Sequence, residues 1–177
     1  MGQGKSSDRA LLLAGLPVTE HRLTLNGVAT AVLEGGEGPP VVLLHGPAAY
    51  GAAWLRVIPA LAASWRVVAP DLPGHGASDT FAAPVEPDRV MEWLDDLIVC
   101  TCDIPPVLVG HTLGGAIAVH FAAERSERLA GLVLVDTLGL HGFAPHPEFG
   151  AAVQAFMSEP TEPALERLWR YCAFDVA

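Results

Sequence analysis

The sequence is poor in cysteine, in positive charge and in long apolar runs, and each shortage excludes a class of protein. It has three cysteines, of which Cys100 and Cys102 are one residue apart, so neither a disulfide framework nor a zinc site is expected. Ten basic residues against twenty acidic ones give a net charge of −10, which disfavours nucleic acid and anionic membranes as partners. No apolar run is long enough to cross a bilayer, and residues 1–8 are polar, unlike a secretory signal. We therefore expect a cytoplasmic protein without a metal or other cofactor.

The apolar residues that are present suffice for one sizeable core. Hydrophobic residues make up 51% of the 177 residues and charged residues 17%, which excludes disorder as the main state. Continuous apolar runs predict strands buried on both faces of a sheet, at residues 41–44, 65–69, 107–110 and 129–136. An Asn26-Gly27 turn between two alternating segments predicts a hairpin in front of them.

Helical patterns separate these runs. We expect helices over residues 54–63, over 88–99 with Asp88 as N-cap, and from 113 to about 125, whereas residues 1–8 look frayed before a short turn of helix at 9–13. This alternation predicts an α/β protein with a doubly wound, mostly parallel sheet. Ligands of such sheets bind beyond the carboxyl ends of the strands, where His45, Asp71, Thr112 and Asp136 fall.

One stretch, Val107 to Ala116, joins a strand, a very tight turn and a helix. Its spacing matches the nucleophile elbow G-x-S-x-G, with Thr112 where serine is expected. Small residues are needed two positions before and after the nucleophile, and Gly110 and Gly114 meet that need. The Thr112 hydroxyl would then face a cleft, and the N–H of Leu113 would donate to a developing oxyanion. A glycine-rich strand-to-helix turn is common, however, so this motif alone does not identify a hydrolase.

Four motifs follow one another in the chain, and together they resemble the α/β-hydrolase superfamily in its lidded esterase, epoxide-hydrolase and C–C-hydrolase branch. They are residues 41–46, the segment D-L-P-G-H-G-A-S at 71–78, residues 110–115 and residues 132–136. The resemblance covers about residues 20 to 140. It implies an elbow nucleophile, an oxyanion hole, and a histidine base oriented by an acid. The activity it implies is hydrolysis of an ester or related acyl bond in a small apolar substrate.

The sequence departs from that family at three places. Thr112 adds a methyl group that restricts its side chain, and Pro47 has no N–H where many relatives supply the second oxyanion donor, which leaves Ala48 as the alternative. The acid usually follows a seventh strand and the histidine an eighth, and neither strand is present here. We therefore expect a C-terminally incomplete relative with impaired activity.

Other residues could complete the site. Asp136 is the candidate acid, and His141 or His146 would then be the base. The oxyanion loop and cleft are assigned to six residues: His45, Gly46, Pro47, Ala48, His111 and Leu113. Structural or surface roles are expected for His21, His75 and His120, and His45 is expected to shape the oxyanion loop rather than to titrate.

The predicted organisation is an N-terminal extension at 1–18, a partial hydrolase core at 19–142, and the start of a helical lid at 143–177. Two ordinary packing helices would explain the last segment equally well. Two other functions stay open. The fold could be a non-catalytic module that binds a small apolar molecule, or it could self-associate through strand 129–135 at an exposed sheet edge.

Overall fold

The computed structural model describes residues 3–82, 85–140 and 146–172 of the chain. It separates into two compact units, residues 1–140 and 141–177, and each is described by itself. In the part of the chain that is described, no helix combines the length and apolar character needed to cross a membrane.

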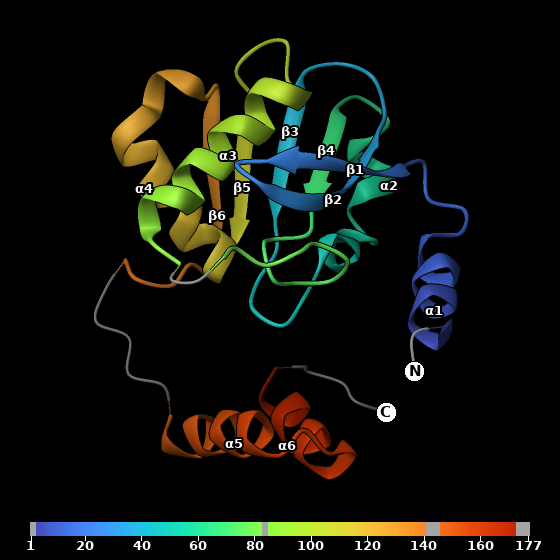
Figure 1. Ribbon diagram of the computed structural model, residues 1–177, viewed down its shortest axis with the longest axis vertical. Helices are drawn as coiled ribbons and strands as arrows, with labels where there is room; N and C mark the ends of the chain where they lie inside the picture. Colours follow the sequence, from blue (N-terminus) through green and yellow to red (C-terminus); the bar gives the residue numbers. More distant parts are fainter. Residues whose placement is uncertain (1–2, 83–84, 141–145, 173–177) are drawn as a thin grey trace. The chain divides into compact units, whose positions relative to one another are not determined.

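The first unit is built on a six-stranded sheet with the order β1-β2-β4-β3-β5-β6 (Figure 1). The strands are β1 Thr19–Leu25, β2 Val28–Gly35, β3 Pro40–Leu44, β4 Arg66–Pro70, β5 Val107–His111 and β6 Gly131–Val135. Strands β4, β3, β5 and β6 run parallel, and the β1-β2 hairpin joins β4 in antiparallel pairing. The predicted mostly parallel sheet with an antiparallel hairpin is thus confirmed.

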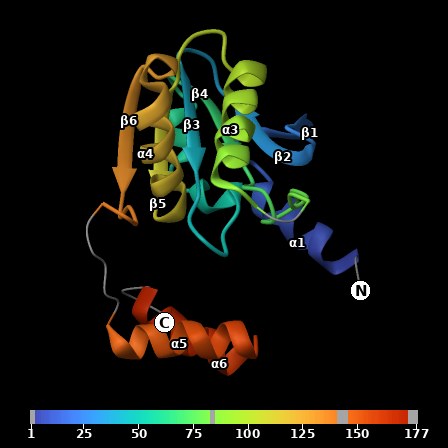
Figure 2. The same cartoon turned by 60° about the vertical axis from the view of Figure 1, so that its left-hand side comes forward.

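Helices cover both faces of this sheet, because its parallel strands carry apolar side chains on both sides. On one face, α3 (Pro87–Thr101) and α4 (Leu113–Arg125) enclose a core in which Trp93 and Phe121 are fully buried (Figure 2). On the other face, the 3₁₀ turn η1 (Gly51–Trp54) and α2 (Ile58–Leu61) pack their apolar residues against β3 and β4. Strand β6 ends the sheet, and Leu132, Val133 and Val135 on it are 37–45% exposed.

Three local predictions were wrong. The helix expected over 54–63 is broken into η1 and α2, because Pro59 in the first turn of α2 has no N–H to continue a helix from the preceding turn. The N-cap of α3 is Glu86, followed by Pro87, so Asp88 lies inside the first turn and faces the positive end of the helix dipole. The N-terminal helix α1 spans Gln3–Leu13 and begins earlier than expected.

The second unit is a pair of helices, α5 (Pro147–Ser158) and α6 (Glu162–Cys172). Their apolar residues lie at the helical spacing read from the sequence. The rings of Phe149 and Tyr171 meet edge to face at 6.1 Å, and the Tyr171 hydroxyl donates to Glu148 at 3.2 Å.

Candidate active site

The sharp turn between β5 and α4 places Thr112 on a strained backbone. Its φ is 47° and its ψ is −105°, a conformation rare for any residue with a β-branched side chain. Strain of this kind costs about 1–3 kcal/mol and persists only where surrounding contacts enforce it. Here the Thr112 N–H donates to the carbonyl of Val135 at 3.0 Å, and the Thr112 carbonyl accepts from the Ala116 N–H at 3.0 Å. The turn is therefore fixed from β6 and from within α4.

Glycine is required around this turn for steric reasons. A Cβ at Gly110 would lie 2.4 Å from the carbonyl oxygen of Gly114, and a Cβ at Gly114 would lie 2.4 Å from that of Leu44. Both distances are below any real contact, and backbone atoms cannot rotate away. The close approach of α4 to β5 and β3 therefore depends on the absence of these side chains, as the motif spacing indicated.

The Thr112 hydroxyl faces the loop that follows β3, residues 45–51, which we call the oxyanion loop. A Cβ at Gly46 would lie 2.3 Å from Thr112 Oγ1 and 3.0 Å from His111 Nδ1, so both side chains lie directly over this glycine. Thr112 Oγ1 is itself buried and has no hydrogen-bond partner among the described residues. Among the described residues of the first unit, no histidine nitrogen forms a hydrogen bond with this oxygen.

His45, at the start of the oxyanion loop, is fully buried. Its Nε2 accepts a hydrogen bond from the Leu72 N–H at 2.9 Å, so Nδ1 carries the ring proton and donates to the Gly46 carbonyl at 2.7 Å. Burial, with a smaller contribution from the neighbouring His75, lowers the pKa of His45 from 6.5 to about 4. The ring is therefore neutral near pH 7, and it ties the loop after β3 to the loop after β4.

Asp71 follows β4 and binds the last residue of the oxyanion loop, Gly51. Its carboxylate is fully buried and accepts from the Gly51 N–H at 2.7 Å and from the Ala77 N–H at 2.8 Å. The hydroxyl of Ser78 donates to the Asp71 carbonyl at 2.8 Å. A Cβ at Gly76 would lie 2.1 Å from the Asp71 carboxylate. These contacts explain the D-L-P-G-H-G-A-S segment. Sequence reasoning placed Asp71 at the correct end of the sheet but did not assign it to the site, although the motif gave that signal.

The candidate oxyanion donors are the backbone N–H groups of Leu113 and Ala48. Leu113 begins α4, a helix of 13 residues, so its N–H has no partner within the helix and lies at the positive end of the helix dipole. Pro47 is exposed and offers no N–H. Ala48 is also exposed and has a φ of 56°, so it occupies a conformation typical of a tight loop.

Among the described residues, the candidate acid Asp136 makes no hydrogen bond with Thr112 or with a histidine that would fix it as part of the site. It follows β6 at the same end of the sheet and is exposed. His141 lies outside the described residues. His146 belongs to the second unit, where its Nδ1 is 4.0 Å from Glu148.

The other histidines make local contacts. His75 Nδ1 lies 3.1 Å from the Pro73 carbonyl, and its ring meets that of His45 edge to face at 5.3 Å. His21 and His120 lie at the surface beside Glu34 and Glu124, each 3.3 Å away. Across the described residues, no group of three or more metal-ligating side chains occurs.

Comparison with known proteins agrees with this geometry. Residues 39–160 match the family model described as the alpha/beta hydrolase fold. Over 102 residues the chain is 40% identical to a pimeloyl-[acyl-carrier protein] methyl ester esterase of Chromobacterium violaceum, covering 58% of this chain and 38% of that protein. Over 103 residues it is 43% identical to a lipase of Mycobacterium tuberculosis, covering 58% and 39%.

Among solved structures, the chain is similar to a 2-hydroxy-6-oxo-6-phenylhexa-2,4-dienoate hydrolase from a Rhodococcus species. That match has a TM-score of 0.75 and 31% identity, and it covers 85% of this chain and 57% of that one. The chain thus spans between about two fifths and three fifths of the length of these relatives.

Proposed function

This chain belongs to the alpha/beta hydrolase fold family, and from that premise we propose that it is built to hydrolyse an ester or related acyl bond of a small apolar substrate, with Thr112 as the nucleophile. The observation that carries the proposal is the strained Thr112 turn, whose hydroxyl faces the oxyanion loop and makes no competing hydrogen bond. The names of the relatives, an esterase and a lipase among them, support the ester class.

In the proposed reaction, Thr112 Oγ1 attacks the substrate carbonyl as its proton passes to a base. The carbonyl electron pair moves onto oxygen, and the N–H groups of Leu113 and Ala48 stabilise that oxyanion. Its collapse expels the alcohol, which takes the proton from the base, and leaves an acyl-threonine. Water activated by the same base then releases the acid and restores Thr112.

The base in this scheme is His141 or His146, oriented by Asp136. Among the described residues of the first unit, none accepts a hydrogen bond from Thr112 Oγ1 as a base would, and Pro47 removes one customary donor. Loss of a single oxyanion donor typically lowers a rate about 10²–10³-fold. We therefore propose that turnover by this chain is slow compared with that of a relative that has a complete set of catalytic groups.

A fluorophosphonate probe tests the nucleophile without requiring turnover. It forms a covalent bond to an activated hydroxyl, so mass spectrometry of the intact chain reports labelling directly. We expect slow labelling at Thr112, faster labelling of Thr112→Ser because the methyl group is gone, and none of Thr112→Ala. If neither the wild type nor Thr112→Ser is labelled, Thr112 is not a nucleophile.

A non-catalytic binding module is the second candidate. It is favoured by the unpartnered Thr112 hydroxyl and by an apolar hollow of about 500 Å³ next to Leu113, lined also by Phe81, Met91 and Ile117. Binding of a small apolar fluorescent probe that survives Thr112→Ala, with no turnover by either form, would favour this function over hydrolysis.

A further inference from the structure

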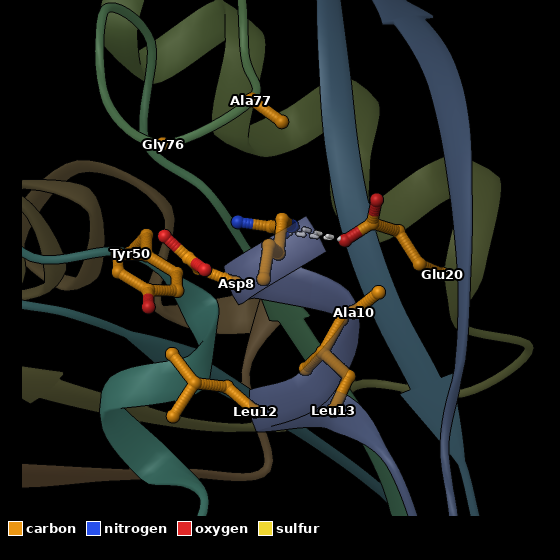
Figure 3. Close-up of a pocket in the computed structure, with 9 residues that line it drawn as sticks. Asp8, Ala10, Leu12, Leu13, Glu20, Tyr50, Gly76 and Ala77 are labelled. Atoms are coloured by element: carbon orange, nitrogen blue, oxygen red, sulfur yellow. Dashed lines mark hydrogen bonds and ion pairs between the residues drawn. The ribbon is translucent and has the colours of Figure 1, made fainter. Parts of the chain in front are cut away.

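A second hollow of the first unit lies beside the N-terminal helix α1. It has a volume of about 800 Å³ and is lined by residues of α1, β1 and the loops after β3 and β4. Figure 3 shows Tyr50 and Glu20 facing this hollow from two sides, with Gly76 and Ala77 bordering it on a third. Tyr50 is part of the oxyanion loop, so α1 reaches that loop directly.

Arg9 is the residue of α1 that makes this connection. Its Nη1 lies 2.8 Å from the carboxylate of Asp71, and its Nε donates to Glu20 at 2.5 Å. Its guanidinium carbon also lies 5.2 Å from the centre of the Tyr50 ring, a cation–π distance. The Arg9 side chain is only 14% exposed and that of Asp71 is fully buried, so their contact is largely shielded from water, whereas the Glu20 side chain is 33% exposed.

The charge of Arg9 matters because Asp71 is fully buried. Among the described side chains, Arg9 is the one cation within ion-pair distance of Asp71, since His45 is neutral near pH 7. Burial opposes the charge of Arg9, but the hydrogen bond that Arg9 donates to Glu20 and the charge of Asp71 outweigh it and raise the pKa of Arg9. Removal of one partner of such a pair leaves an uncompensated buried charge, which is strongly unfavourable.

The same carboxylate holds the backbone of the site. One Asp71 oxygen accepts from the Gly51 N–H at the end of the oxyanion loop, and the other accepts from the Ala77 N–H and lies beside Arg9. Arg9 is thus linked to the oxyanion loop by two polar contacts: Arg9 binds the Asp71 carboxylate, and that carboxylate accepts from the Gly51 N–H. Asp71 is therefore held by two backbone N–H groups and by one guanidinium.

We propose that Arg9 is a positioning residue for the oxyanion loop. It fixes the carboxylate of Asp71, and Asp71 fixes the loop at Gly51 and the following turn at Ala77. The consequence for catalysis rests on the proposed function, whereas the positioning itself does not.

Amide hydrogen exchange of the full chain, followed by NMR at Gly51, Ala77 and Leu108, tests this proposal. Gly51 and Ala77 report the Asp71 contacts, and the fully buried Leu108 in β5, which is paired on both sides by β3 and β6, reports global unfolding. In Arg9→Met we expect exchange at Gly51 and Ala77 to be roughly 10–100-fold faster, as for a lost charge-assisted interaction, with a smaller change at Leu108.

Two further variants make the test specific. Glu20→Gln weakens the outer contact of Arg9 and leaves the Asp71 contact in place, so it should leave exchange at Gly51 near that of the wild type. Arg9→Lys keeps the charge but loses the planar guanidinium contacts, so its exchange rate at Gly51 should lie between those of the wild type and Arg9→Met. If Arg9→Met does not fold, Arg9→Lys is used in its place, with the same comparison of exchange at Gly51 and at Leu108. Unchanged exchange at Gly51, or equal acceleration at Leu108, would overturn the proposal.

Fluorophosphonate labelling separates this proposal from the proposed function. If the wild type is labelled, we expect slower labelling of Arg9→Met, and equal rates would contradict a link from Arg9 to the oxyanion loop. If the wild type is not labelled, the nucleophile assignment fails, and the exchange at Gly51 still decides the role of Arg9.

Discussion

Acidification should destabilise this protein through His45 in particular. The imidazole is buried, accepts from the Leu72 N–H and donates to the Gly46 carbonyl, so the folded protein favours its neutral form. Its pKa is lowered from 6.5 to about 4 in the folded state, whereas the unfolded chain keeps a value near 6.5. Between these two values the unfolded chain binds the extra proton. The free energy of unfolding must therefore fall as the pH falls through this range.

The size of the effect follows from the same two values. A change of one in pKa corresponds to about 1.4 kcal/mol, so a fall from 6.5 to about 4 corresponds to roughly 3 kcal/mol. The contribution is fully present above pH 6.5 and is lost by about pH 4. Domains of this size are stable by only about 5–15 kcal/mol, so the loss is large enough to measure.

Urea unfolding between pH 4 and 7.5, compared for the wild type and His45→Gln, isolates this residue. Any other group that titrates in this range does so in both proteins, so the difference between the two curves belongs to His45. NMR titration of the His45 ring carbons gives its pKa independently. A measured pKa near 6.5, or parallel stability curves for the two proteins, would refute the reasoning.

Four further substitutions test the packing around the turn, in helix α5 and at the sheet edge. Gly46→Ala places a Cβ 2.3 Å from Thr112 Oγ1, so we expect a loss of about 1–3 kcal/mol in urea unfolding, partly recovered by adding Thr112→Ala. Gly114→Ala meets backbone at 2.4 Å and should cost about 3 kcal/mol, whereas Gly150→Ala, with open space around it, should stabilise α5 slightly in thermal unfolding. Val133→Lys on β6 should abolish self-association in light scattering, if copies pair there.

Three of these predictions have a result that contradicts them directly. Equal stability of Gly46→Ala and the wild type would mean that the Thr112 hydroxyl does not lie over Gly46. A harmless Gly114→Ala would contradict the close approach of α4 to β3. A wild-type chain that is monomeric at high concentration would contradict pairing through β6.

The order of the elements could be read from the sequence because each carried a local signal. Apolar runs marked the buried strands, Asn26-Gly27 marked the hairpin, and Gly110 and Gly114 marked the turn around Thr112. The break between η1 and α2 was not predicted, because the apolar spacing over residues 54–63 is that of one continuous helix and only Pro59 indicates the interruption. The N-cap of α3 was predicted two residues too late, at Asp88, because Asp is a common N-cap residue, whereas Pro87 in the first helical position marks the true start.

The roles of charged and titratable residues required the three-dimensional structure. His45 was expected to shape the oxyanion loop, but its two hydrogen-bond partners and its lowered pKa depend on how deeply it is buried. Arg9 gave no signal, because nothing in its neighbourhood in the chain indicates that it meets Asp71, which lies far along the sequence.

The amino-acid sequence by itself determined the fold class, the end of the sheet where the site lies, and the position of the strained hydroxyl. Those features follow from side-chain size and apolar periodicity over a few neighbouring residues. Only the tertiary structure decided which polar groups meet, because a buried contact such as Arg9 with Asp71 depends on distances between segments that local pattern does not encode.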